Sequence, residues 1–209
     1  PAMIIFAVPE EYYILLKKAG YNNTTVMASV GHIMMLGNGG PAFNSGIYPK
    51  QNFKMNLTVS EDKKKVVNDL IAQAEKSDKI IIMSDGDREG EIIAWSLLKF
   101  CKFPLEKCYR AVTHEITPKA LIEAIKHPVG FNDNLVNAGL TRMMIDKLIG
   151  YGLSPLGKKY LGTKSIGRCQ SVGLKLISDR ETEIANFIPE VYYNLYLHFT
   201  KNSVEYKAK

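Results

Sequence analysis

Three carboxylates stand at alternate positions in one short segment of the sequence. Asp85, Asp87 and Glu89 fall within residues 84–91, SDGDREGE, directly after the apolar run at 80–83. Oxygen ligands at such short range suit a hard cation such as Mg²⁺, which keeps several waters and bridges to phosphate. Ligands of open α/β sheets bind at the carboxyl ends of strands, and here a buried strand is followed by a helical pattern. The pattern therefore predicts a metal site.

Two other kinds of structure fit parts of this segment. An EF-hand loop matches the opening positions, but its twelfth position requires a bidentate Glu and here is Ser96, and a strand rather than a helix comes first. That interpretation is rejected. An exposed acidic turn that caps a helix N-terminus stays open, because the helix dipole favours negative charge there. Four acids around a glycine-flanked turn after a buried strand favour the metal site.

The elements around this turn alternate between strand and helix. Short apolar runs predict strands at 3–8, 24–30, 79–83 and 107–113, and helical patterns begin after Pro9, at Ser60, at Glu91 and at Thr117. Strands alternating with crossover helices indicate an α/β fold with a mainly parallel sheet covered on both faces. The stretch from 37 to 56, rich in Gly, Asn and Pro, is expected to be one long loop.

The pattern changes after about residue 128. Helical patterns at 134–149, 155–160 and 165–185 have no strand between them, and from Glu190 the residues alternate as in a strand, with a turn at 201–202 and a second strand. We therefore expect three parts, 1–127, 128–189 and 190–209. A lone strand pair cannot bury its apolar face, so the chain is expected to be a fragment of a longer protein.

Composition describes an ordinary globular chain. It has 209 residues, 46% of them hydrophobic, with 27 Lys and Arg against 21 Asp and Glu, which excludes disordered and collagen-like classes. The longest apolar runs are too short to span a membrane, and no signal peptide begins the chain, so a cytoplasmic protein without a membrane partner is expected. Three cysteines without a C-x-x-C pair indicate neither a disulfide framework nor a zinc site.

Basic charge is concentrated in one stretch. Residues 151–180 contain six basic residues and one acid, so they carry 6 − 1 = +5 of the net +6. Such a patch attracts the nucleic acid backbone in a salt-dependent way. A solvated lysine face is the alternative. Arg168 follows Gly167 at the start of a helical pattern, where free backbone N–H groups also attract phosphate, and this favours nucleic acid.

Five ordered segments resemble one family. DGDREGEIIAW at 85–95 closely resembles the D-x-D-R-E-G-E-x-I-A-W motif in the Toprim domain of type IA DNA topoisomerases. The resemblance continues through SVGHI at 29–33, RAVTHEIT at 110–117, IDKLIGYGLSP at 145–155 and SIGRCQSV at 165–172. These segments span nearly the whole chain.

The resemblance implies a fold and a reaction. The fold is a Toprim, Rossmann-like parallel sheet with flanking helices, then part of a helical domain that binds single-stranded DNA, then the start of a β domain. Such enzymes cleave one strand with a tyrosine, pass another strand and religate. Mg²⁺ would be held by Asp85, Asp87 and Glu89 and would offset negative charge at the phosphates. Glu89 and Arg88 would be catalytic.

The family pattern also implies DNA contacts. The partners are single-stranded or underwound duplex DNA and the remaining topoisomerase domains. Arg142 and Asp146 lie four residues apart and so share a helix face, although Asp146 pairing only with Arg142, or core packing by Tyr151, are alternatives. The implied DNA-binding residues are His32, Arg142, Met143, Asp146, Tyr151, Lys158, Ser165, Ile166, Gly167, Arg168, Cys169 and Gln170.

Four departures from the family pattern bear on activity. Ala7 occupies the position of the family's acid/base Glu, and alanine neither transfers a proton nor holds a metal. Glu11 aligns with a family Lys, which reverses a charge near the scissile phosphate. Glu10 or Glu11 is nevertheless a candidate replacement for the missing carboxylate. Met143 stands where the family has a second Arg. None of the 11 tyrosines lies in a context like Y-x-R-T-D/E. We therefore expect that this chain does not cleave DNA by itself.

Two alternatives to a topoisomerase fragment remain. The first is a catalytically inactive Toprim protein that binds DNA but has lost its acid. The second is another Mg²⁺-dependent Toprim enzyme, such as a primase or nuclease. The second accounts for Asp85 and Asp87 but not for the motifs around Asp146 and Arg168.

Overall fold

Four parallel strands form the central sheet of the computed structural model, which describes residues 2–6, 11–18, 20–115 and 117–209. Their order is β2-β1-β7-β8, with β1 at Ala2–Phe6, β2 at Thr24–Ala28, β7 at Lys79–Ser84 and β8 at Cys108–Val112. The register places Ile4 of β1 beside Val26 and Ile81. All four carboxyl ends therefore lie at the same edge of the sheet, where the acidic turn follows β7.

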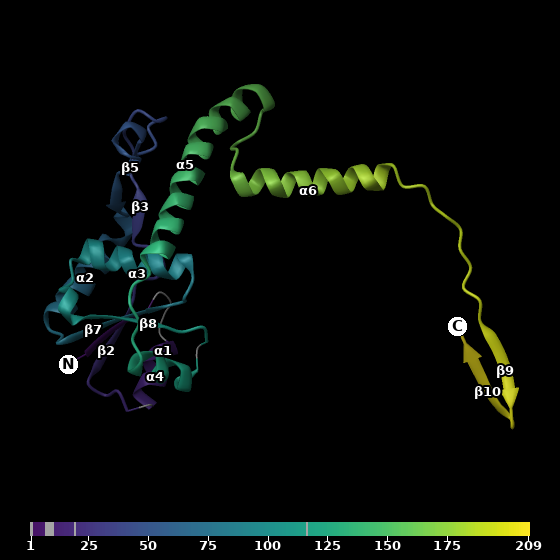
Figure 1. Ribbon diagram of the computed structural model, residues 1–209, viewed down its shortest axis with the longest axis horizontal. Coiled ribbons are helices and arrows are strands. Elements are labelled where there is room, and N and C mark those ends of the chain that lie inside the picture. The colour runs from purple at the N-terminus through teal and green to yellow at the C-terminus, as the bar shows by residue number, and fades with distance from the viewer. Residues whose placement is uncertain (1, 7–10, 19, 116) are drawn as a thin grey trace. The chain divides into compact units, whose positions relative to one another are not determined.

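Two cores form because side chains of a strand alternate between the faces of a sheet. Ile5 and Ile82 pack on one face with α2 (Lys64–Glu75) and α3 (Arg88–Cys101). Ile4 and Ile81 pack on the other with α1 (Glu11–Lys18) and α4 (Pro118–Lys126). Figure 1 shows these helix pairs on opposite sides of the sheet. The predicted α/β fold, a parallel sheet covered on both faces, is confirmed.

The stretch expected to be one loop is an ordered excursion between β2 and α2. β3 (Met34–Leu36) pairs antiparallel with β6 (Leu57–Val59), and β4 (Ile47–Tyr48) pairs with β5 (Lys54–Met55). These strands could not be predicted, because two or three residues are too few to show a periodicity. Short 3₁₀ turns lie nearby at Pro49–Gln51 (η1) and Glu61–Lys63 (η2), and a third, η3, occupies Leu105–Lys107.

One long helix replaces two predicted ones. α5 runs continuously from Asp133 to Leu161 through Pro155, where a break was expected because proline lacks an N–H and obstructs the preceding turn. Asn132 caps its start by accepting a hydrogen bond from the Leu135 N–H at 3.1 Å. The prediction of two helices was wrong, because the helix continues through this residue.

The chain divides into two compact units, residues 1–167 and 168–209. The second contains α6 (Arg168–Ala185) and a hairpin of β9 (Leu197–Lys201) and β10 (Val204–Ala208), in which Phe199 stacks on Tyr206 with ring centroids 5.3 Å apart. Every residue from 168 to 209 is exposed. The strand predicted from Glu190 begins only at Leu197. Within the described residues, no helix is both long and apolar enough to cross a membrane.

Candidate functional site

The acidic turn passes from β7 into α3 at the carboxyl edge of the sheet. Asp87 is the N-cap of α3, and its Oδ1 accepts a hydrogen bond from the Gly90 N–H at 2.7 Å. Gly90 is required here, because a Cβ would lie 2.1 Å from the carbonyl oxygen of Asp85. Asp87 therefore caps α3, and the cap uses one of its two carboxylate oxygens. The exposed Asp85 carboxylate has no part in this cap.

Glu89 joins three distant parts of the first unit. Its Oε2 lies 2.9 Å from Nε2 of His32, which follows β2, and its Oε1 accepts a hydrogen bond from Nη1 of Arg142 on α5 at 3.2 Å. Nε of Arg142 lies 3.6 Å from Oδ2 of Asp146. We call these four side chains the His32–Asp146 chain. Its members are 39% to 47% exposed, so they are ordered by one another yet open to a ligand.

The hydrogen bonds of His32 indicate which ring nitrogen carries a proton. A carboxylate accepts, so Nε2 donates to Glu89. Nδ1 is buried and has no hydrogen-bond partner among the described residues. A protonated Nδ1 would leave a buried donor unsatisfied, so the arrangement favours the Nε2–H tautomer. The loop before it is held by Lys63, whose Nζ donates to the Val30 carbonyl at 2.8 Å.

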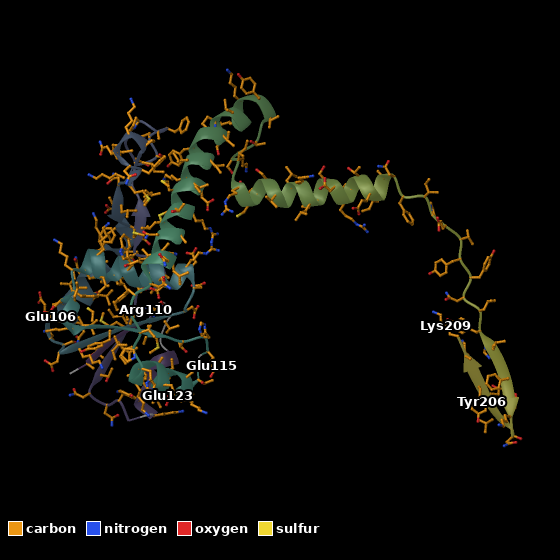
Figure 2. The ribbon with its side chains drawn as sticks, viewed as in Figure 1. Glu106, Arg110, Glu115, Glu123, Tyr206 and Lys209 are labelled. Atoms are coloured by element: carbon orange, nitrogen blue, oxygen red, sulfur yellow. The ribbon has the colours of Figure 1, made fainter. Side chains whose placement is uncertain are left out.

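A buried ion pair lies beneath the acidic turn. Nε of Arg110 donates to Oε1 of Glu91 at 2.9 Å, and the two side chains are 0% and 3% exposed. Arg110 Nη2 also donates to the Asp85 carbonyl at 2.9 Å, and its Nη1 donates to the carbonyls of Ile82, Ser84 and Ala111. Burial lowers the pKa of Arg110, and the charge of Glu91 opposes this shift. Figure 2 shows Arg110 within the layers of sheet and helices.

This pair also connects to α5. Oε2 of Glu91 accepts a hydrogen bond from the backbone N–H of Asn132, the N-cap of α5, at 3.1 Å. A guanidinium with several carbonyl partners and a carboxylate with two donors satisfy the condition under which a buried charge pair is tolerated. Arg110 and Glu91 thus connect the turn that carries Asp85 to the helix that carries Arg142.

The three carboxylates that are predicted to hold Mg²⁺ differ in their surroundings. No group of three or more His, Cys, Asp or Glu side chains in the described part of the chain is close enough to hold a metal ion. Glu89 is engaged with His32 and Arg142 instead. Asp85 and Asp87 remain, both exposed and both hard oxygen donors. Their chemistry fits Mg²⁺, which often binds through one or two carboxylates and keeps its waters.

The other predicted residues fall into separate groups. Arg88 is exposed at the start of α3, and Met143 is half-buried on α5. Tyr151 and Lys158 lie farther along α5, and Tyr151 is exposed with Nζ of Lys147 4.2 Å from its ring centroid. The core-packing interpretation of Tyr151 is therefore wrong, whereas the contact between Asp146 and Arg142 is present.

The motif at 165–172 crosses the boundary between the two units. Ser165, Ile166 and Gly167 follow α5, and the Ile166 N–H donates to Oγ of Ser154 at 3.0 Å. Arg168, Cys169 and Gln170 form the exposed first turn of α6 in the second unit. Ala7 and Glu10 lie outside the described residues.

Sequence reasoning missed two features of this edge. Arg110 was noted only as part of a motif, although an arginine inside an otherwise apolar strand is a signal of a buried partner. His114 was missed as a neighbour of the acidic turn. A Cβ on Gly86 would lie 3.0 Å from Cε1 of His114. The signal available was its position just after β8, beside β7 at the same edge.

Comparisons with known proteins show which family and fold this chain resembles. A family described as Toprim domain matches residues 10–116, and one described as DNA topoisomerase matches residues 130–209. The structure of full-length topoisomerase I from Thermotoga maritima is similar, with a TM-score of 0.75 and 35% sequence identity. The match covers 90% of this chain and 31% of that chain, so the chain spans about a third of the length of that protein.

Proposed function

Since the chain belongs to the type IA DNA topoisomerase family, we propose that it forms the magnesium- and DNA-binding part of an enzyme that changes DNA topology. In that reaction one strand is cleaved, another is passed through the break, and the first is religated. The His32–Asp146 chain is the observation that carries the proposal. It joins residues 53 and 57 positions apart in the sequence at the edge where a parallel sheet binds its ligands.

Each residue of this edge has a proposed role. Asp85 and Asp87 hold Mg²⁺, which supplies positive charge next to phosphate oxygens. Arg142, held between Glu89 and Asp146, presents its remaining N–H groups to a phosphate. Glu89 fixes Arg142 and His32 in place. Arg88 and the free N–H groups of the first turn of α3 add to the attraction for phosphate.

Binding and cleavage are proposed to be separate in this chain. None of its tyrosines lies in the family's Y-x-R-T-D/E context, so the nucleophile is expected to come from another part of a longer protein. The basic stretch at 151–180, including Lys158 and Arg168, supports binding to the DNA backbone. We therefore expect the 209-residue chain to bind single-stranded DNA in preference to duplex and to leave supercoiled plasmid intact.

Fluorescence anisotropy of a labelled single-stranded oligonucleotide tests this function. Affinity should fall steeply between 50 and 200 mM salt, because each neutralised phosphate adds to the salt dependence. Arg142→Ala should weaken binding by about tenfold, the loss of one charge-assisted contact. Lys126→Ala, which removes an exposed basic residue paired with Glu123 on α4 and outside the stretch 151–180, is the control and should change affinity less. Binding that ignores salt and Arg142 would refute the proposal.

Ala7 supports a second candidate function, a DNA-binding Toprim protein without catalysis. Ala7 follows Phe6, whose strand pairs in parallel with β7 at Met83, and it stands where the family has its acid. Ala7→Glu would restore a carboxylate in the sequence next to the end of β1. Tighter Mg²⁺ binding by Ala7→Glu in titration calorimetry would indicate a site that has lost one carboxylate. Unchanged binding would favour an organisation that never used one.

A further inference from the structure

Phe43 is a bulky residue held in an unusual conformation at the surface. Its side chain is 63% exposed, and its φ of 54° is in the left-handed region that bulky residues rarely adopt. An exposed phenyl ring gains little from burial that would offset this backbone strain. Such strain persists only where the surrounding structure imposes it, and it is concentrated at functional sites.

The excursion that carries Phe43 is braced by its own backbone. The Gly46 N–H donates to the Gly39 carbonyl at 2.6 Å, the Asn56 N–H to the Gly46 carbonyl at 2.7 Å, and the Gly37 N–H to the Asn56 carbonyl at 2.8 Å. A Cβ on Gly46 would lie 2.1 Å from the Gly37 carbonyl oxygen, so the backbone segments next to β3 and β4 approach as closely as glycine permits. Phe43 therefore extends from a fixed frame.

The ring of Phe43 lies against α5. A Cβ on Gly152 would be 3.2 Å from Cε2 of Phe43, so glycine leaves room for the ring at this point of the helix. The neighbouring Tyr151 is also exposed, and Lys147 covers its ring. Figure 1 shows the excursion of β3 and β5 beside α5. One edge of the Phe43 ring is thus supported while most of its surface stays accessible.

The two segments that meet at this ring, the excursion and the end of α5, carry basic charge, which favours a polyanion. Residues 33–60 contain Lys50 and Lys54 and no acidic residue, and residues 147–161 contain three lysines and no acidic residue. Lys50 and Lys54 are exposed. Exposed aromatic rings among basic residues are how proteins hold single-stranded nucleic acid, because every base has a face that can stack. A surface that binds another protein would be expected to carry acidic as well as basic residues at its polar rim.

We propose that Phe43, supported by Gly152, is a stacking site for one base of single-stranded DNA. The inference rests on the proposed function and extends DNA binding from the sheet edge to the excursion at 37–56. Lys50, Lys54 and Lys147 would attract the flanking phosphates. Because stacking reads no base edge, the site is indifferent to sequence.

The test separates the ring from the fold. Phe43→Asn removes the ring but fits the left-handed backbone better, so the folded protein should be at least as stable. Its affinity for a single-stranded oligonucleotide should be roughly tenfold weaker, the loss of one base–aromatic stack. Phe53→Asn is the matched control, because Phe53 is also exposed and has a φ of 54°; its affinity should change less than about twofold, well below the loss of one stack. Phe43→Trp should restore binding, with its added fluorescence quenched by DNA.

Each result has one meaning. Weaker binding by Phe43→Asn alone, with an unchanged urea midpoint and quenching in Phe43→Trp, supports the stacking site. Wild-type affinity in Phe43→Asn, or no quenching in Phe43→Trp, overturns it while leaving the proposed function intact, and would point to a protein surface instead. An equal loss in Phe53→Asn overturns the role of the contact with α5. Failure of the wild-type chain to bind single strands refutes the proposed function itself.

Discussion

At the scale of single residues, Asp87 serves two purposes that substitutions can separate. Its Oδ1 caps α3, and its exposed carboxylate is a proposed Mg²⁺ ligand. Asn and Asp are equally good N-caps, whereas Ala costs about 1 kcal/mol. The two demands need different properties, because the cap needs only an oxygen and the metal needs charge.

Asp87→Asn is therefore expected to keep stability and lose metal binding. Urea denaturation should show the free energy of unfolding unchanged for Asp87→Asn and lowered by about 1 kcal/mol for Asp87→Ala. Titration calorimetry with MgCl₂ should show weaker binding for both. Asp69→Asn, an exposed acid on α2, is the control and should bind as wild type. Full metal affinity in Asp87→Asn would remove Asp87 from the proposed site.

The three cysteines are expected to differ in reactivity. Burial raises the pKa of Cys101 to about 12, and burial with the nearby charge of Glu106 raises that of Cys108 to about 11. Only the thiolate is nucleophilic, so both should react slowly at pH 8 and faster as pH rises toward those values. Cys169 is exposed. Ellman's reagent should modify one thiol rapidly, and Cys169→Ser should abolish that phase. Three equal rates in the folded chain would contradict this.

The same raised thiol pKa values bear on stability. The folded chain keeps both thiol protons above the pH at which the unfolded chain loses them. This contribution to stability is therefore complete below about pH 8.5, the ordinary thiol pKa, and is lost as pH rises toward 11 and 12. Alkaline rather than acidic conditions weaken this part of the core.

At the scale of elements, close packing of α3 against α5 depends on one glycine. A Cβ on Gly139 of α5 would lie 2.2 Å from Cδ1 and 2.8 Å from Cγ1 of Ile92, which is buried on α3. Gly150 on the same helix has only the Ile166 carbonyl oxygen near, at 4.0 Å. Close packing therefore requires glycine at position 139, whereas nothing near position 150 excludes a larger side chain.

Alanine at these positions should shift stability in opposite directions. Ala favours a helix over Gly by up to about 1 kcal/mol, so Gly150→Ala should stabilise the chain by about that amount. Overpacking costs about 1–3 kcal/mol. Gly139→Ala should therefore lower the free energy of unfolding by about 1–2 kcal/mol, although alanine brings the same gain in helix propensity. Urea denaturation of both variants makes the comparison. Stabilisation by Gly139→Ala would mean that α3 and α5 adjust freely.

The buried pair of Arg110 and Glu91 is expected to be essential for folding. Glu91→Gln keeps the size of the side chain but leaves Arg110 as a buried, unpaired charge, which typically costs 3–5 kcal/mol. The chain should lose most of its stability, measured by thermal unfolding. Lys64→Met, which breaks an exposed pair with Glu61, should cost less than about 1 kcal/mol. An equal loss of stability in Glu91→Gln and Lys64→Met would show that the buried pair is no more important for stability than the exposed one.

The limits of sequence reasoning are clear at this scale. Strands and helices around Asp85 were predictable because apolar periodicity records which face is buried. The partners of Glu89 were not, since a contact between His32 and Glu89 depends on how the loop after β2 folds over α3. Continuity through Pro155 and the two-residue strands of the excursion were equally hidden, because tertiary packing decides them.

At the scale of the whole molecule, the two units differ in how they are stabilised. The first has buried residues on both faces of its sheet. In the second, residues 168–209, none is buried, and apolar side chains such as Leu174 and Ile177 are more than 60% exposed. Its ion pair between Lys175 and Asp179 is exposed and so contributes little.

Limited trypsin digestion should therefore cut the second unit first. Arg168, Lys175 and Arg180 are exposed, and cleavage follows local opening of the backbone. Mass spectrometry should find an early, persistent product that ends near residue 168. A chain of residues 1–167 should keep the urea midpoint of the full chain. A large drop in that midpoint would show that the first unit depends on the second.

Finally, α5 is long and is attached to α3 near only one of its ends. At about 1.5 Å per residue, its 29 residues extend roughly 43 Å, and its fixed end is joined to α3 through Glu91, Gly139 and Arg142. The arm beyond Arg142 is about 28 Å long, so tilting the base by about 5° would move the far end by 2–3 Å. A small rotation of α5 at the acidic turn would therefore produce a larger displacement at Leu161, and Gly152, where Phe43 makes its contact, lies along this arm.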